Sequence, residues 1–237
     1  MPDETIGCRQ ASSGIIDKLP GSRLEPGELG AVMARAGAGK TACLTHLAIE
    51  QLLRDTPVLH VCIDIVPDKV KVWYHELLKN LFADQPGCDL NDLQHRIEPL
   101  RFIMSFLNQT FSPDKLEQSV QNLKQQAKFT PSVIILDGLD FDHNPRSAFE
   151  ALRELARKLS VQIWMSARMH RHVSDVNERG IPYPVNEMDD LFNSILMLEP
   201  DGERIKLQIL KQGENYNPVD SEFLLDPHTF LILQQQG

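Results

Sequence analysis

A run of small residues that ends in Lys-Thr, residues 34 to 41, most constrains how this 237-residue chain can fold. It reads Ala-Arg-Ala-Gly-Ala-Gly-Lys-Thr and follows an apolar stretch, Leu29 to Met33. A helical pattern begins at about Lys40. Small side chains let backbone N–H groups point toward one centre, which creates an anion-binding nest at a helix N-terminus. Because a buried strand precedes the run and a helix follows it, we predict an α/β fold.

The run nearly matches the P-loop, or Walker A, pattern, with Ala34 in place of the first glycine. In that pattern Lys40 brings a mobile positive charge to the β- and γ-phosphates of ATP, and the Thr41 hydroxyl ligates Mg²⁺. A glycine-rich turn that merely precedes Lys-Thr is the alternative, and the flanking strand and helix disfavour it. The nucleotide-binding residues that we predict are Arg35, Ala36, Gly37, Ala38, Gly39, Lys40, Thr41 and Ala42.

Short β-rich runs alternate with helical patterns along most of the chain, which predicts βαβ units and a mostly parallel twisted sheet flanked by helices. The predicted strands are residues 29–33, 57–65, 101–107, 132–136, 161–166, 194–198, 205–210 and 230–233. Helices are predicted to begin at Lys40, at Pro67, at Ser112-Pro113 and at Asn144-Pro145. Gly202 lies between two of the last strands and predicts a C-terminal antiparallel hairpin. Residues 1–23, rich in Gly, Ser and Pro, are predicted to be a lead-in segment.

The apolar run Val133 to Leu136 ends in Asp137, as expected of a strand that is buried on both faces. An acid at this place in a P-loop protein is the Walker B residue, which binds Mg²⁺ through water. A solvated strand end is the alternative. We interpret the nearby Asp140 and Asp142 as loop residues or helix-start acids.

Composition limits the classes of partner and the compartment. The net charge of −9 disfavours broad attraction to nucleic acid or to anionic membrane. Residues 145–180 nevertheless contain seven Lys/Arg and four Asp/Glu, so the sequence still allows a local basic surface. No apolar run is long enough to cross a bilayer, and the start of the chain lacks a signal-peptide pattern. The four scattered cysteines predict a reduced, cytoplasmic chain.

Leu24-Glu25-Pro26-Gly27-Glu28-Leu29, followed by a strand and the loop, resembles the start of the RecA-like core of KaiC/RadA-type ATPases and DnaB-type replicative helicases. Ala34 followed by Arg35 is more similar to the helicase branch. Residues 155–166 and 190–211 resemble the family's later helix, strand and terminal hairpin. The resemblance implies a RecA-like P-loop NTPase fold and one ATP-binding domain over residues 24–237. It also implies ATP and Mg²⁺ as ligands and a homo-oligomer such as a hexamer.

Some positions depart from the family pattern. The catalytic Glu that usually follows the second strand corresponds to Asp64, which is one methylene shorter. The Gln that senses the γ-phosphate corresponds to Ala167, between Ser166 and Arg168. Helicase relatives have a Lys and an Arg near the last strands that reach a neighbouring subunit's nucleotide. In this sequence only the Lys has a counterpart, Lys211.

The roles that the resemblance implies are therefore Asp64 and Lys40 as catalytic residues, and Thr41 and Asp137 as metal ligands. Because the binding parts match the family and the hydrolytic parts do not, we expect slow turnover.

Three functions fit these features. The first is a slow Mg²⁺-dependent ATPase or nucleotide switch that acts as a homo-oligomer on an unidentified protein partner. The second is a DNA-handling helicase or recombinase-type motor, which the net charge disfavours. The third is an ATP-binding protein without turnover, favoured by Asp64 and Ala167. The polar cluster Arg168, His170, Arg171 and His172 is open to two interpretations, as a partner or phosphate contact and as solvated loop charges.

Overall fold

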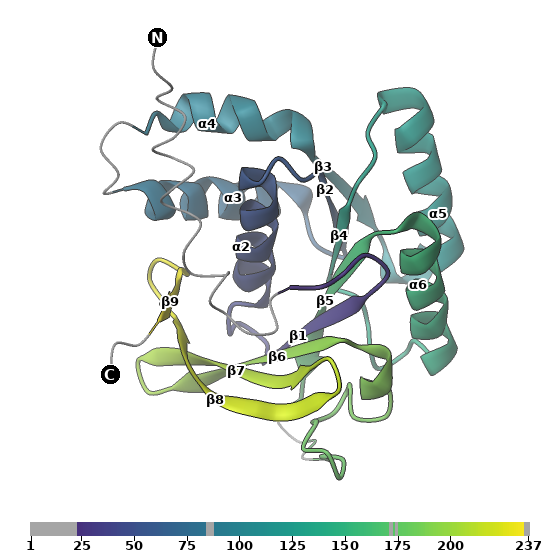
Figure 1. Ribbon diagram of the computed structural model, residues 1–237, viewed down its shortest axis with the longest axis vertical. Coiled ribbons are helices and arrows are strands. Elements are labelled where there is room, and N and C mark those ends of the chain that lie inside the picture. Colours follow the sequence, from purple (N-terminus) through teal and green to yellow (C-terminus); the bar gives the residue numbers. More distant parts are fainter. Residues whose placement is uncertain (1–22, 84–87, 171–172, 174, 235–237) are drawn as a thin grey trace.

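The chain is built around a mixed sheet in which the strand before the glycine-rich loop lies near the middle (Figure 1). The computed structural model describes residues 23–83, 88–170, 173 and 175–234. Within those residues the sheet has nine strands in the order β3-β2-β4-β5-β1-β6-β7-β8-β9. In chain order the strands are β1 (Leu29–Arg35), β2 (Val58–Ile63), β3 (Arg101–Phe106), β4 (Val133–Asp137), β5 (Gln162–Met169), β6 (Ser194–Asp201), β7 (Arg204–Gln212), β8 (Asn215–Leu225) and β9 (Ile232–Gln234).

The sheet is parallel from β3 to β6 and antiparallel from β6 to β9. The hairpin between β6 and β7 turns at Gly202, which has a φ of 60°. The predicted α/β class, the mostly parallel sheet and the C-terminal antiparallel hairpin are therefore confirmed. Strand β8 was not predicted.

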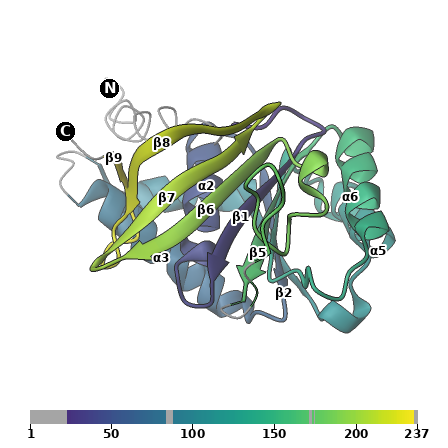
Figure 2. The same ribbon diagram turned by 90° about the horizontal axis from the view of Figure 1, so that it is seen from below.

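Helices cover both faces of the sheet: α2, α3 and α4 lie on one side, and α5 and α6 lie on the other (Figures 1 and 2). Their bounds are α2 (Lys40–Leu53), α3 (Pro67–Phe82), α4 (Leu90–Ile97), α5 (Pro113–Asn122) and α6 (Arg146–Leu159).

Several helix starts follow from local chemistry. Pro67 is the first residue of α3, and the Ser112 hydroxyl accepts a hydrogen bond from the Lys115 N–H (3.3 Å) at the start of α5. Asp89 caps α4 by accepting from the Asn91 N–H (2.8 Å), although this helix was not predicted. Helix α6 begins just after the predicted Asn144-Pro145, but Asn144 does not cap it, because its side-chain amide donates to the Asp140 carbonyl (2.6 Å).

The apolar core lies in two layers, one on each face of the sheet. Every residue of β4 is buried, as predicted for a central strand. Helix α2 is buried at each position from Ala42 to Glu50, so it is a central helix and not a half-exposed one. The loop at its N-terminus is therefore held by the most enclosed strand and helix of the fold.

Three further expectations can be compared with the structure. None of the described helices has both the length and the apolar character needed to cross a membrane. Cys43 and Cys62 are free thiols, but Cys88 is disulfide-bonded, so the prediction of a fully reduced chain is wrong at Cys88. The predicted lead-in segment lies almost wholly outside the described residues, and Leu24 is already buried against the core.

Candidate phosphate-binding site

The glycine-rich loop connects the carboxyl end of β1 to the first residue of α2. Gly39 has a φ of 91°, which only glycine adopts without strain, and a Cβ there would lie 2.7 Å from the Leu225 side chain of β8. The glycine therefore serves both the turn and the close approach of the C-terminal strands. Neighbouring strands β5 and β6 run parallel to β1, so the loop lies at the carboxyl edge of the sheet, where ligands bind in open α/β sheets.

Lys40 folds back over this loop. Its ammonium donates hydrogen bonds to the carbonyls of Ala34 and Arg35, both at 3.0 Å. Burial lowers the pKa of Lys40 to about 8, with Asp137 opposing this shift and Arg168 adding to it. A partly desolvated cation that is held only by local carbonyls can move to a phosphate at small cost.

Asp137 faces Lys40 and Thr41 from the end of β4. Its side chain is 2% exposed, and burial raises its pKa while hydrogen bonds from Thr41 and Ser166 oppose the shift. Its Oδ2 has no hydrogen-bond partner among the described residues. A buried carboxylate oxygen without a partner is costly, so this atom indicates a ligand.

Mg²⁺ fits the oxygens that meet here. It prefers oxygen ligands and is usually held by one or two protein groups together with water and substrate phosphates. Thr41 and Asp137, both predicted as metal ligands, lie within hydrogen-bond reach of each other. Among the described residues no group of three or more His, Cys, Asp and Glu side chains could hold a metal by itself. A magnesium ion held by these two side chains would need water and phosphate oxygens as its further ligands.

Alternation along β5 corrects the sequence interpretation of Ala167. Ala167 is fully buried in the core layer on the far side of the sheet from α2. Its neighbours Ser166 and Arg168 point to the loop side, because successive side chains of a strand face opposite ways. The Ser166 hydroxyl hydrogen-bonds Asp137 and accepts from the Gly138 N–H (2.8 Å). The residues of β5 that face the side of the glycine-rich loop are thus Ser166 and Arg168.

Asp64 directly follows β2, which lies two strands away from β5, and in the described part of the chain it makes no hydrogen bond to the glycine-rich loop. Its carboxylate accepts from the backbone N–H of Asn108 (3.2 Å) and from the Asn108 side-chain amide (2.8 Å). It is exposed and has a φ of 53°. The structure therefore groups Lys40, Thr41 and Asp137, and leaves Asp64 at the neighbouring part of the same edge.

Asn108 was not singled out from the sequence, yet it connects three loops at this edge. Besides binding Asp64, it accepts from the Asp140 N–H (3.2 Å) and donates to the Gly138 carbonyl (3.3 Å). The loops after β2, β3 and β4 are therefore held together by one side chain. No spacing rule marks such a residue, because its partners come from three separate segments of the chain.

A cavity of about 880 Å³ lies on the outer side of the loop. Its volume is within the range typical of small-ligand sites. The glycine-rich loop lines part of this cavity, and the β6–β7 turn and the connection between β8 and β9 line the rest. The lining residues are Arg35, Ala36, Gly37, Ala38, Pro200, Gly202, Glu203, Arg204, Ile205, Asp226, Pro227 and His228.

The polar cluster after β5 is only partly described, because Arg171 and His172 lie outside the described residues. His170 contacts Asp142 (Nε2 to Oδ2, 2.6 Å), and the Tyr183 hydroxyl donates to the same carboxylate (2.6 Å). His170 and Asp142 thus form a paired contact between loops, and Asp142 is a loop residue, as one of its two interpretations held.

Lys211 does not reach outward. Its side chain is 3% exposed, and its ammonium donates to the Asp189 carbonyl (2.9 Å) and lies 5.0 Å from the centre of the Tyr216 ring. A lysine buried in its own subunit cannot contact a neighbour's nucleotide without leaving these partners. Within its own chain the Lys211 ammonium is therefore already bound, and its role between subunits stays a prediction.

Comparison with known proteins does not assign a family. No protein-family model matches the chain, and no curated protein sequence matches it. The interpretation of the site depends on the geometry given above.

Proposed function

We propose that this chain is a RecA-like P-loop ATPase domain that binds Mg²⁺–ATP and hydrolyses it slowly. The single observation that carries the proposal is the meeting of Lys40, Thr41 and the unpartnered Asp137 Oδ2 around the glycine-rich loop. An ammonium, a hydroxyl and a carboxylate in this arrangement suit a magnesium-bound phosphate chain.

Each residue has a separate role in the bound state. The backbone N–H groups of the loop bind the phosphates, and Lys40 exchanges its two carbonyl partners for phosphate oxygens. Thr41 and Asp137 hold Mg²⁺, which when bound neutralises charge on the β- and γ-phosphates. The cavity beside Arg35 and Ala38 is large enough for the nucleoside.

Hydrolysis requires a water oxygen to bond to the γ-phosphorus as the bond to the β–γ bridging oxygen breaks. The electron pair of the broken bond stays on ADP, and the water's proton passes to the Asp64 carboxylate and then to solvent. Asn108 already donates hydrogen bonds to both oxygens of that carboxylate, so its capacity to accept from a water is partly occupied. Among the described residues Asp64 also makes no hydrogen bond to the loop, so no loop group orients its carboxylate toward the attacking water. Both features favour slow turnover.

A second candidate function is an ATP-binding switch without turnover. It is favoured by the same observation, that Asn108 already donates to both carboxylate oxygens of Asp64. Phosphate release separates the two functions. We expect the wild-type protein to release well under one phosphate per second, and we expect Asp64→Asn to abolish release while ATP affinity stays within about threefold. Asp64→Glu should raise the rate. Several turnovers per second without a partner, or full activity of Asp64→Asn, would contradict the role of Asp64.

Magnesium dependence tests the binding proposal itself. We expect Mg²⁺ to tighten ATPγS binding to the wild-type protein and to have about tenfold less effect on Asp137→Asn. Asp142→Asn is the matched control, because Asp142 binds His170 and Tyr183 away from the loop. An equal magnesium effect in wild type and Asp137→Asn would contradict the assignment of Asp137.

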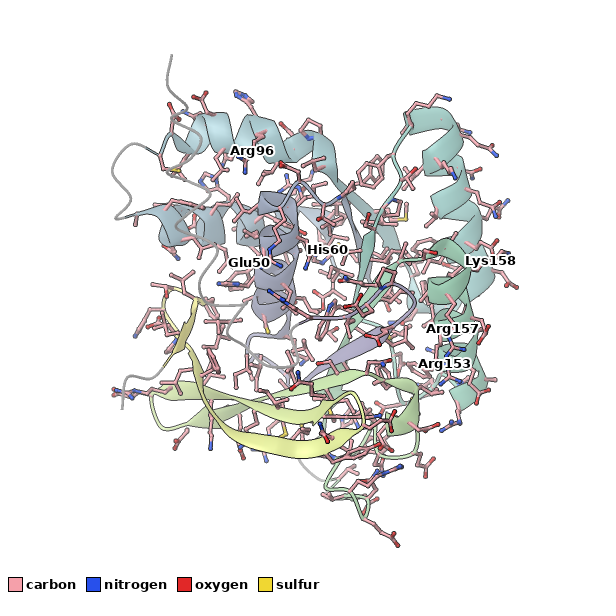
Figure 3. All side chains as sticks on the ribbon, in the orientation of Figure 1. Glu50, His60, Arg96, Arg153, Arg157 and Lys158 are labelled. Carbon is pink, nitrogen blue, oxygen red and sulfur yellow. The ribbon has the colours of Figure 1, made fainter. Side chains whose placement is uncertain are left out.

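Homo-oligomerisation and weak nucleic-acid binding remain predictions. The first now depends on the resemblance alone, since Lys211 is buried. For the second, basic side chains do lie along α6 (Figure 3), but Arg157 pairs with Glu154 and Lys158 with Glu117. These pairs reduce the charge available to a phosphate backbone, and this supports weak binding near physiological salt.

A further inference from the structure

A small cavity lies between α3 and α4, on the face of the sheet that α2 also covers (Figure 1). Its volume is about 190 Å³, which is below the range typical of sites for drug-sized ligands and corresponds to the liquid volume of about six water molecules. Two helices and the first residue of β3 supply its lining. The polar residues of this lining are Lys71, His75, Gln94, Glu98 and Arg101.

Arg101 is a cation that is held in place at this cavity. Its guanidinium lies over the ring of Tyr74, 4.5 Å from the centre, and no described residue accepts a hydrogen bond from it or forms an ion pair with it. Tyr74 is buried, and its hydroxyl lies 3.1 Å from Nδ1 of the buried His60, so the ring beneath Arg101 is fixed. The charge of Arg101 contributes to the lowered pKa of His60. The cavity therefore has a positioned guanidinium with N–H donors available.

His75 presents a second donor. The side-chain amide nitrogen of Gln94 lies 2.9 Å from Nδ1 of His75, and an amide nitrogen can only donate. Nδ1 is therefore the acceptor, and the proton of the neutral ring is on Nε2. Lys71, one helical turn before His75, adds an ammonium. Its contact with Asp68 (2.9 Å) joins two exposed side chains, and such a pair is weak enough to open for a ligand.

We infer that this cavity binds a small oxyanion of the phosphate class, either free phosphate or the phosphate group of a small metabolite. A guanidinium, an imidazole N–H and an ammonium around one cavity supply the donors that phosphate oxygens accept. With His75 neutral, Lys71 and Arg101 against Glu98 give the lining a net charge of +1. Both this modest charge and the small volume favour a single phosphate group over a nucleotide.

The inference does not depend on the proposed function. Arg101 is the first residue of β3, which runs parallel to β2, so the cavity lies toward the amino edge of the sheet. The glycine-rich loop follows the last residue of β1 and lies at the carboxyl edge. A ligand in one site therefore does not contact the residues of the other.

Proton NMR of the His75 ring tests the inference, since this signal comes from the cavity itself. The titration uses the Lys40→Ala protein, so that phosphate at the glycine-rich loop does not contribute, and the ring signals are assigned by their loss in His75→Gln. At pH 7 and constant ionic strength we expect phosphate to give a saturable shift with a dissociation constant of about 1 mM or below. Potassium chloride should give none. A parallel titration with glycerol 3-phosphate shows whether the free ion or a phosphate monoester binds more tightly.

Variants in the same Lys40→Ala protein identify the groups that bind. We expect Arg101→Gln to weaken phosphate binding about tenfold or more, with Arg101→Lys between, because it keeps the charge and loses the fork. Lys71→Ala alters an exposed side chain and should weaken binding about threefold, which tests the cavity even if Arg101→Gln does not fold. Lys69→Ala is the matched control. It removes the same charge from the same helix, about 200° around its axis from Lys71, and should leave the affinity unchanged.

The absence of a saturable shift, an equal shift with chloride, or unchanged affinity in both Arg101→Gln and Lys71→Ala would overturn the inference. Failure of the proposed function is a separate result. A wild-type protein that binds phosphate at His75 but does not bind Mg²⁺–ATPγS would contradict the proposed function alone.

Discussion

The proposed function predicts that Lys40 links nucleotide binding to pH, because burial lowers its pKa to about 8 in the free protein. Bound phosphates favour the charged ammonium and must raise this pKa. Below about pH 7 the lysine is protonated in both states, so binding takes up no proton there. Above pH 8 the free protein loses the proton, and ATP affinity should fall up to about tenfold per pH unit.

Titrations at pH 7 and pH 9, in buffers of different ionisation enthalpy, measure this proton uptake. We expect uptake near zero at pH 7 and approaching one proton per ATPγS at pH 9. Binding at pH 9 without proton uptake would show that Lys40 is not the group that meets the phosphates.

Asn108 should position Asp64 without binding nucleotide. We expect Asn108→Ala to slow phosphate release about tenfold, because the Asp64 carboxylate and the three loops lose their shared partner. ATPγS affinity should stay within about twofold. Asn122→Ala, at the exposed end of α5, is the control. Unchanged release in Asn108→Ala would rule out this positioning role.

Sequence spacing located the residues that lie close together at the loop but not those that depend on side-chain direction. Lys40, Thr41 and Asp137 could be predicted because they occupy fixed places at the end of a strand or the start of a helix. The side-chain directions of Ala167 and Lys211 could not be predicted. In a strand, a shift of one residue in the alignment moves a side chain to the other face of the sheet. A long side chain such as that of Lys211 can also turn inward.

At the scale of elements, the contact between the ends of β2 and β4 is the tightest next to the site. Gly138 follows β4 with a φ of 98°, and a Cβ there would lie 2.1 Å from the carbonyl oxygen of Ile63. We expect Gly138→Ala to lower the free energy of unfolding by about 3 kcal/mol or more, because it adds a clash to backbone strain.

Urea denaturation measures this loss of stability. Gly202→Ala is the control, since Gly202 also has a positive φ but a Cβ there would meet nothing within 4 Å. It should lose only about 1 kcal/mol. Equal losses in the two variants would show that β2 and β4 do not meet closely at Gly138.

Elements with strong local signals were predicted, and those fixed by tertiary packing were not. Ser112-Pro113 and Pro67 start helices by their own chemistry. Strand β8 is long but is specified by pairing with β7 and not by its own pattern. In the same way, helical spacing from Leu116, Val120 and Leu123 would place Ala127 on the apolar face of α5. A wider, π-type turn over residues 123–127 rotates it to the surface.

For the whole molecule, two buried histidines should control acid stability. Burial lowers the pKa of His46 to about 4 and that of His60, inside β2 (Figure 3), to about 3. Both stay neutral in the folded state, whereas the unfolded chain protonates them near pH 6.5. Their contribution to stability is therefore complete above about pH 6.5 and is lost as pH falls toward the folded-state values.

Two such groups change the free energy of unfolding by up to about 2.7 kcal/mol per pH unit between about pH 6 and pH 4. Urea denaturation across this range should show the slope, and His60→Gln should reduce it by about half. His95→Gln, which alters an exposed histidine, should leave it unchanged. A slope that His60→Gln does not alter would contradict the buried, neutral state of His60.

The central claim is that the loop from Arg35 to Ala42 binds the phosphates of ATP, and Lys40 tests it most directly. Calorimetric titration of Mg²⁺–ATPγS should give at least about tenfold weaker binding for Lys40→Ala than for wild type, the loss of one charge-assisted contact of about 1.5–3 kcal/mol. The exposed Lys79→Ala control should bind as the wild type does. Unchanged affinity in a folded Lys40→Ala protein, or no binding by the wild type, would contradict the account.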